Sequence, residues 1–194
     1  MTTPSPVLLP SPRLSASELR AAVLDGEVVA IGEGFVPIDA PVTAYARAAS
    51  LAPLLIDQRV VIADRSAAWV WGWGRAPAAI MTCVAITARI PSPDRRRLRS
   101  REVIIDDDER RMLGSVAVTA PVRTLLDLAR HDPSDDVIAL LAAGIAAHDV
   151  APETIEAALT RRRSLSFVRP ARARLAAAFE RALGAEQAQP LLTR

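Results

Sequence analysis

The stretch Val116–Ala129 (VAVTAPVRTLLDLA) decides the class of fold, because it places a β-strand directly before an α-helix. Val116–Val118 is a short apolar run typical of a strand. Ala120-Pro121 marks the start of a helix, since proline fits the first helical turn, and leucines carry that helix onward. We expect an α+β fold, with a small mixed sheet and with helices concentrated in the C-terminal half.

Three further helices are predicted after this stretch. Ser134-Asp135-Asp136 caps an Ala/Leu-rich helix that runs to about His148. Pro152-Glu153 opens a helix to about Arg162, and Pro170 opens a last one to about Leu183. Residues 185–194 are expected to form a C-terminal tail.

A helix and a hairpin are predicted at the N-terminal end. Residues 1–14 contain four prolines and are expected to be a flexible tail. Ser15-x-x-Glu18 is a capping box that starts a helix, which Gly26 ends. Glu27–Ile31 and Phe35–Ile38 are two strand-like runs around a glycine-rich turn, and they predict a β-hairpin.

The middle of the chain alternates short helices and strands. The sequence predicts a helix from Pro41 to about Leu51 and a second one capped by Asp64 and closed by Gly72. Strands are predicted at Val60–Ile62, Met81–Thr87 and Glu102–Ile105, with an arginine cluster in the connection between the last two.

Composition excludes several classes of protein. The 194 residues carry a net charge of +2 and are 51% apolar, which excludes a wholly disordered chain. One cysteine excludes a disulfide scaffold and a multi-cysteine zinc site. The sequence contains no run of about 18 apolar residues, so no membrane span is predicted. The N-terminus lacks the features of a signal peptide. We therefore expect a cytoplasmic protein with no membrane partner.

The charges are arranged in blocks along the chain. Residues 95–101 (RRRLRSR) carry a net +5, residues 102–157 carry 4 Arg against 12 acids, and residues 158–194 carry 8 Arg against 2 acids. All the basic residues are arginine, so almost nothing titrates between about pH 7 and 12, and a small positive excess is enough to raise the pI to 9.4. The high pI is therefore no argument for nucleic-acid binding, whereas the blocks indicate solvated faces or electrostatic partner surfaces.

The catalytic inventory is thin, so we expect no enzyme activity, no catalytic residue and no cofactor. His131 and His148 lie near predicted helix ends, where a surface position is favoured over a catalytic one. Cys83 lies in an apolar strand, which favours an inert buried thiol. The consecutive acids Asp106, Asp107, Asp108 and Glu109 lack calcium-loop spacing, so a solvated turn or an acidic contact surface is favoured over a metal site or a hydrolytic centre.

Two further groups admit both a structural and a functional interpretation. Trp69, Trp71 and Trp73 either pack in the core or anchor a protein partner, and core packing is favoured. The arginine clusters either bind nucleic acid by bidentate contacts to phosphate or reflect a genome that encodes arginine in place of lysine. The candidate nucleic-acid-binding residues are Arg95, Arg96, Arg97, Arg99, Arg101, Arg161, Arg162 and Arg163.

Four pieces of the chain together resemble the AbiEi-type antitoxins of abortive-infection (type IV) toxin–antitoxin pairs, in their actinobacterial form. They are the helix and hairpin Ser15–Ile38, the segment Asp64–Trp69 (DRSAAW) with its glycine, the two β-runs around a basic loop, and Val118–Ala129 (VTAPVRTLLDLA). The last piece is the most specific. Together they cover about residues 15–183.

The resemblance implies a non-enzymatic antitoxin that neutralises a nucleotidyltransferase-like toxin, with operon autoregulation as a second role. It divides the chain into a tail (1–14), a partial winged-helix-like element (15–40), an α+β antitoxin domain (41–184) and a tail (185–194). A full winged helix needs two helices before its recognition helix, and only fourteen residues precede Ser15, so promoter binding is in doubt.

A toxin that handles nucleotides or RNA is expected to carry a basic cleft. Asp106–Glu109 are the candidate residues to occupy that cleft as a phosphate mimic, with Trp69, Trp71 and Trp73 as the candidate apolar anchors. The alternative is a DNA- or RNA-binding regulator that uses the arginine-rich segments.

Overall fold

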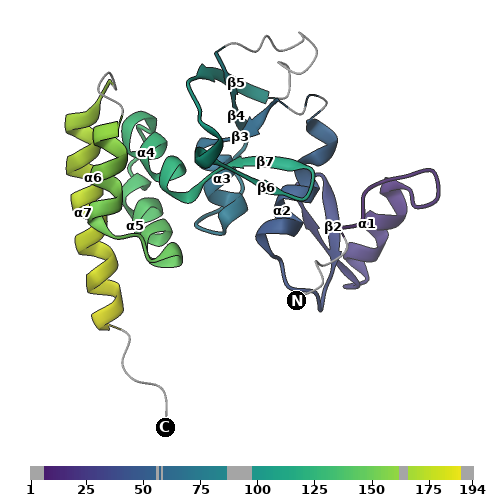
Figure 1. The fold of residues 1–194 in the computed structure, drawn as a ribbon. Coiled ribbons are helices and arrows are strands. Elements are labelled where there is room, and N and C mark those ends of the chain that lie inside the picture. The colour runs from purple at the N-terminus through teal and green to yellow at the C-terminus, as the bar shows by residue number, and fades with distance from the viewer. Residues whose placement is uncertain (1–6, 56, 58, 87–97, 162–165, 189–194) are drawn as a thin grey trace.

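The computed structural model describes residues 7–55, 57, 59–86, 98–161 and 166–188. It is an α+β fold with a two-stranded sheet, a five-stranded mixed sheet and helices that are more frequent in the C-terminal half (Figure 1). The fold class expected from the sequence is confirmed.

The N-terminal element consists of helix α1 (Ala16–Leu24) and the hairpin of β1 (Val28–Ile31) and β2 (Gly34–Pro37). The predicted capping box is present: Ser15 Oγ accepts the backbone N–H of Glu18 at 3.3 Å, and the Glu18 carboxylate accepts the backbone N–H of Ser15 at 2.7 Å. The predicted order of helix, strand, turn and strand is confirmed.

The expectation of a flexible tail over residues 1–14 is wrong for residues 7–14. Leu8 and Phe35 form an antiparallel bridge in which each backbone N–H donates to the other's carbonyl oxygen, at 2.8 and 2.9 Å. Proline removes only its own N–H, so residues between prolines still pair with a strand. Residues 1–6 lie outside the described residues.

Helix α2 (Ala44–Leu51) begins later than the sequence predicts, because Thr43 rather than Pro41 starts it. Thr43 Oγ1 accepts the backbone N–H of Ala46 at 3.2 Å, and this side-chain cap fixes the first turn. The 3₁₀ turn η1 (Ala52–Leu54) follows, with Pro53 inside it.

The five-stranded sheet has the order β5-β4-β3-β7-β6. β3 pairs in parallel with β7 and antiparallel with β4, β4 pairs in parallel with β5, and β6 pairs antiparallel with β7. The strands are β3 (Val61–Ile62), β4 (Ile80–Ala85), β5 (Leu98–Val103), β6 (Arg110–Leu113) and β7 (Val116–Thr119).

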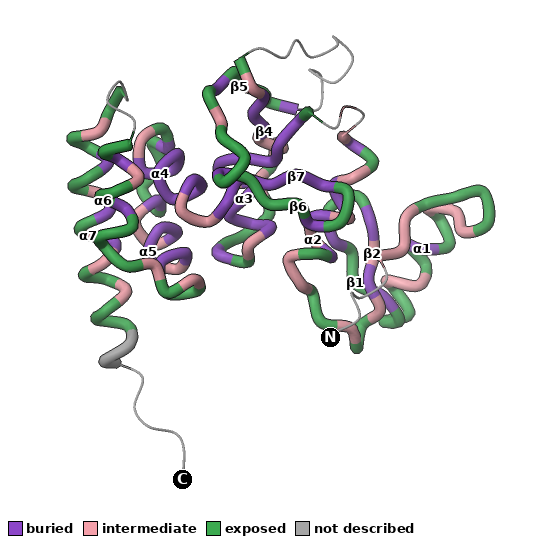
Figure 2. Tube along the Cα trace, in the orientation of Figure 1, coloured by how far each residue is buried: buried purple, intermediate pink, exposed green. Residues whose placement is uncertain are grey.

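The two edge strands differ from the sequence prediction. β5 begins at Leu98 rather than Glu102, so Arg99 and Arg101 are strand residues and not loop residues. β6 is absent from the prediction altogether. Figure 2 shows β6 exposed and its neighbour β7 buried. Edge strands carry charged outward residues, so no apolar run marks them in the sequence.

Helix α3 (Asp64–Trp71) follows β3 and lies between the sheet and the C-terminal helices (Figure 1). Its N-cap is Ala63 with no side-chain cap, so the prediction that Asp64 caps this helix is wrong. The carboxylate of Asp64 instead pairs with Arg101 of β5. The predicted end at Gly72 is confirmed, since Gly72 adopts the left-handed conformation (φ +89°) that favours glycine.

Four helices form the C-terminal half: α4 (Pro121–His131), α5 (Val137–His148), α6 (Pro152–Arg161) and α7 (Val168–Ala188). α7 begins two residues before Pro170, because proline is tolerated within the first turn of a helix. It extends beyond Leu183 to Ala188. The expected tail is therefore helical over residues 185–188, and residues 189–194 lie outside the described residues.

Two buried clusters meet at α3. One joins the hairpin, α2 and the sheet, with Val36, Leu51 and Val118 among its members. The other joins α4 to α7 and includes Leu125 and Leu141. The hairpin thus shares its core with the sheet.

No single helix in the described part of the chain is long and apolar enough to cross a membrane. The pair α5 and α6 passes a test of length and composition together, but the two helices are bent by 109°.

Candidate functional site

Seven side chains of alternating charge form a continuous series of ion pairs that begins at α3, passes through α4 and α6, and ends at the turn before β6. Neighbouring members are joined by ion pairs of 2.6 to 3.3 Å. In order, the members are Asp64, Arg101, Asp127, Arg123, Glu109, Arg161 and Asp108. We call this set the ion-pair chain.

The middle of the ion-pair chain is the most deeply buried part. Arg123 and Asp127 lie one turn apart on α4, and their side chains are 7% and 0% exposed. Arg123 Nε donates to Asp127 Oδ2 at 2.8 Å, and Arg123 Nη1 donates to Glu109 Oε2 at 2.8 Å. A charge among apolar side chains is tolerated only when it is paired, so these contacts are a condition for folding α4 onto the sheet.

One end of the ion-pair chain joins α3 to β5. Arg101 donates to both carboxylate oxygens of Asp64 at 3.1 Å, and its Nη2 lies 2.7 Å from Asp127. Burial raises the pKa of Asp64, and the Arg101 guanidinium only partly offsets that effect. Burial lowers the pKa of Arg101, but the two carboxylates outweigh it and raise that pKa overall. The arginine therefore stays charged and holds both acids in place.

The other end of the ion-pair chain lies at the four consecutive acids. Asp106 is the N-cap of the 3₁₀ turn η3, and the other three acids form that turn (Asp107–Glu109). Asp106 and Glu109 form a capping box there, in which the Glu109 carboxylate accepts the Asp106 backbone N–H at 3.0 Å. Asp107 pairs with Arg110. Asp108 pairs with Arg161 of α6 at 2.6 Å, and this arginine lowers the pKa of Asp108.

This geometry corrects the interpretation of Asp106–Glu109 as an open acidic surface. Glu109 is buried and bound to two arginines, so it is unable to reach a partner. Asp107 and Asp108 are exposed, with side-chain exposures of 91% and 62%, but each already has an arginine partner. The turn is mainly a structural joint between the sheet and α6.

The same geometry bears on three of the eight arginines predicted to bind nucleic acid. Arg101 and Arg161 belong to the ion-pair chain and neutralise acids within the protein. Arg99 is exposed on β5. The remaining candidates for nucleic-acid binding lie outside the described residues: Arg95, Arg96, Arg97, Arg162 and Arg163.

The tryptophans follow the core interpretation. Trp69 and Trp73 are 8% and 6% exposed, so they are not available as surface anchors. Trp71 is half-buried, and its indole Nε1 donates to the carbonyl oxygen of Thr119 at 2.9 Å. Trp73 packs directly on Gly144 of α5, where a Cβ atom would lie 2.7 Å from the indole ring.

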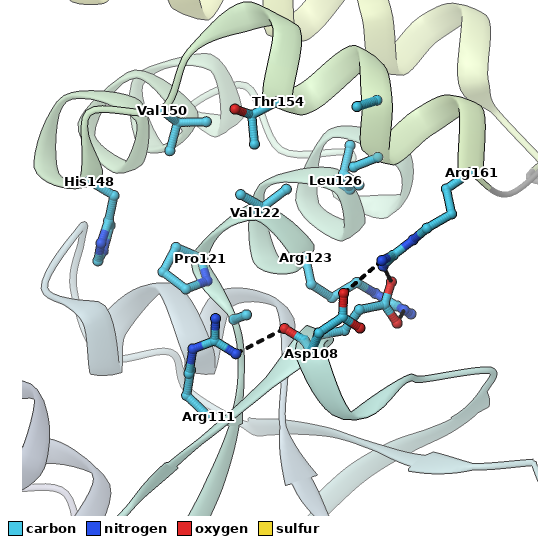
Figure 3. A pocket seen from close by; sticks show the side chains of 14 residues that line it. Asp108, Arg111, Pro121, Val122, Arg123, Leu126, His148, Val150, Thr154 and Arg161 are labelled. Carbon is cyan, nitrogen blue, oxygen red and sulfur yellow. Dashed lines mark hydrogen bonds and ion pairs between the residues drawn. The ribbon is translucent and has the colours of Figure 1, made fainter.

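A cleft of about 530 Å³ opens between η3, the start of α4 and α6 (Figure 3). Val122, Leu126 and Val150 contribute to its largely apolar lining, and Arg161 borders it. Arg111 lies at its rim and donates to the carbonyl oxygens of Asp108 and Arg110, at 2.9 and 3.0 Å. Asp108 and Glu109 also line this cleft, and both are paired with arginines.

The groups most suited to catalysis are poorly placed for it. His148 borders the cleft, but its ring packs edge-on against Trp71 and Trp73, and burial lowers its pKa. His131 packs against Phe167 on the surface. Cys83 is fully buried, and burial raises its pKa to about 12, as expected for an inert thiol. Within the described ranges, no group of three or more His, Cys, Asp or Glu is arranged to hold a metal ion.

Sequence reasoning missed the centre of this site. Arg123 and Asp127 belong to the most specific stretch of the resemblance, yet they received no role. They form an opposite-charge pair at positions i and i+4, on the side of the helix opposite its leucines. A charged pair on a polar helix face is usually exposed, so no sequence signal marks this pair as buried.

Searches against protein-family models and against curated proteins find no match. Among solved structures, the chain is similar to the crystal structure of the Rv2827c protein from Mycobacterium tuberculosis, with 19% identity and a TM-score of 0.52. The match covers 84% of this chain and 64% of that one, so this chain corresponds to less than two thirds of its neighbour. At this identity the similarity concerns the fold alone.

Proposed function

We propose that this protein is an antitoxin that neutralises a nucleotidyltransferase-like toxin by binding it directly. The observation that supports this proposal is the ion-pair chain. It occupies Asp108, Glu109 and Asp127 with arginine partners, and a paired, structural carboxylate is a poor general acid or base. A role in binding is therefore favoured over catalysis, and the resemblance to AbiEi-type antitoxins gives the class of partner.

The same pairing disfavours the alternative of a regulator that binds DNA or RNA. Arg101 and Arg161 are already neutralised inside the protein, so phosphate contacts there would have to break existing ion pairs. The alternative depends on Arg99, on exposed arginines of α7 such as Arg169 and Arg181, and on arginines outside the described residues.

The experiment is co-expression with the protein encoded by the adjacent reading frame. Growth is measured with that protein alone and together with this chain, and the pair is then purified through a tag on this chain. Restored growth together with a stable 1:1 or higher-order complex supports the proposal. Restored growth without a complex, or no restoration at all, refutes binding as the mechanism.

A second measurement tests the alternative on the same sample. A fluorescein-labelled duplex of the upstream DNA is titrated with the protein at 50 and 200 mM salt. Phosphate-driven binding through about six contacts falls by roughly 10³-fold between these salt concentrations. Tight binding at 50 mM salt with that loss at 200 mM, together with no restored growth in the co-expression assay, would establish the regulator instead.

A further inference from the structure

The helix–hairpin element and the start of α2 together expose half of the large apolar side chains that are exposed among the described residues. Ten large hydrophobic side chains are exposed among the described residues, and five of them lie between residues 24 and 45. These five are Leu24, Val29, Ile38, Val42 and Tyr45. Exposed apolar side chains that gather on one part of a surface mark an interaction site.

The backbone brings two exposed turns of this element together. One turn, residues 24–27, links α1 to β1, and the other, residues 38–42, links β2 to α2. Val28 pairs with Pro37 in the hairpin, and the Ile38 backbone N–H donates to the carbonyl oxygen of Glu27 at 2.9 Å. We call these two adjacent turns the hairpin end.

The hairpin end combines apolar and acidic side chains. Leu24 is 89% exposed and Ile38 is 60% exposed. The acids beside them, Asp25, Glu27 and Asp39, are exposed and have no ion-pair partner within the described residues. The hairpin end contains these three acids and no basic residue, and the nearest basic residues along the chain are Arg20 and Arg47.

This charge disfavours the role that the element would have in a DNA-reading winged helix. Proteins hold DNA through arginine and lysine contacts to phosphate, and a hairpin bordered by carboxylates repels the phosphate backbone. An apolar centre with an acidic rim instead complements a protein surface that has an apolar centre and a basic rim.

We infer that the hairpin end is the docking surface for the basic face of the toxin. This inference rests on the proposed function, and it assigns the contact to the hairpin end rather than to the turn at Asp106–Glu109. Figure 1 supports a separate surface, because α1 and the hairpin lie at the opposite end of the molecule from α4 to α7. Leu24 and Ile38 supply the buried contacts, and the acids steer the encounter and surround those contacts.

The test measures binding of full-length variants to the purified adjacent-frame protein by biolayer interferometry. Ile38→Ser removes an apolar contact, and Leu183→Ser is its matched control because Leu183 is 58% exposed on α7. We expect Ile38→Ser to weaken the complex by about thirtyfold, as for a central interface residue, and Leu183→Ser to leave affinity unchanged.

The charge arm uses the double variant Asp25→Arg with Asp39→Arg, and Glu180→Arg on α7 as its control. We expect the double variant to slow association by about tenfold at 50 mM salt, with a smaller effect at 300 mM. Circular dichroism and a thermal melt accompany each variant, since exposed substitutions are expected to leave the fold intact.

The outcomes separate this inference from the proposed function. Wild-type binding with unchanged affinity in both hairpin variants overturns the docking surface and leaves the antitoxin proposal standing. Absence of wild-type binding overturns both. Light scattering and the labelled duplex examine the other occupants: a dimer that Ile38→Ser dissociates, or DNA binding that it abolishes, also overturns the inference.

Discussion

Replacing Arg123 with methionine is expected to destabilise the protein severely. The substitution keeps the length and apolar stem of the side chain but leaves two buried carboxylates short of a cation. Asp127 retains Arg101 at 2.7 Å, and Glu109 retains Arg161 at the longer distance of 3.3 Å. Removing one partner of a buried ion pair costs about 3–5 kcal/mol, and the remaining contacts place this case near the lower end, at about 3 kcal/mol.

The assay is urea unfolding followed by circular dichroism at pH 7.5. With a denaturant slope of about 2 kcal/mol per molar urea, a loss of about 3 kcal/mol lowers the midpoint by about 1.5 M. Arg110→Met is the matched control, because the Arg110–Asp107 pair is 43% and 91% exposed. An exposed pair contributes at most about 1 kcal/mol, so the control midpoint shifts by less than about 0.5 M.

A double-mutant cycle decides whether the loss arises from the ion pair itself. Glu109→Gln is combined with Arg123→Met, and the free energies of unfolding of the four proteins are compared. Residues in direct contact within one network show a coupling of about 0.5–3 kcal/mol. Equal shifts for Arg123→Met and Arg110→Met, or strict additivity in the cycle, would refute the reasoning.

Three further predictions concern other buried groups. Burial lowers the pKa of His148 below its ordinary value of 6.5, so the unfolded chain protonates this histidine more readily than the folded protein does, and stability falls as the pH drops below about 6.5. Between pH 7.5 and 5.5, the urea midpoint of the wild type is expected to fall by more than the midpoint of His148→Gln. Cys83 is expected not to react with a thiol-reactive dye in the folded protein and to react fully in 8 M urea. Rapid reaction without urea would contradict its burial. Gly144→Ala forces a Cβ atom against Trp73 and is expected to cost about 1–3 kcal/mol in a thermal melt, whereas Gly184→Ala, with no neighbour within 4 Å, is expected to be neutral or stabilising.

Local signals predicted many of the elements. The capping box at Ser15 and Glu18 and the left-handed glycine at Gly72 depend on residues within a few positions of one another, so the sequence displays them directly. The strand–helix stretch around Pro121 was predicted for the same reason. The start of α2 was missed because Pro41 and Thr43 are both good starting residues, and only the hydrogen bond to Ala46 distinguishes them.

Pairing across the chain was not predictable in this way. Arg161 and Asp108 are 53 positions apart and lie in segments of opposite net charge. Counting charges along the sequence therefore assigns Asp108 to a toxin-binding surface and Arg161 to a nucleic-acid-binding surface. The fold brings them into contact, so both segments lose part of the charge that suggested those surfaces. Helix α6, which packs on α4, brings Arg161 to Asp108 in the turn η3 just before β6, and no local motif encodes that contact.

Internal pairing therefore decides which charges of this protein act on a partner. Around the cleft, Asp108 and Glu109 are neutralised by Arg161 and Arg123, and a neutralised cluster produces little field beyond the Debye length of about 8–10 Å. The hairpin end differs, because Asp25, Glu27 and Asp39 are exposed and have no ion-pair partner within the described residues. The field at the hairpin end remains negative, and it attracts a basic protein while repelling nucleic acid. A toxin that docks there should associate more slowly as salt is added, whereas a toxin that docks at the cleft should associate at a rate nearly independent of salt.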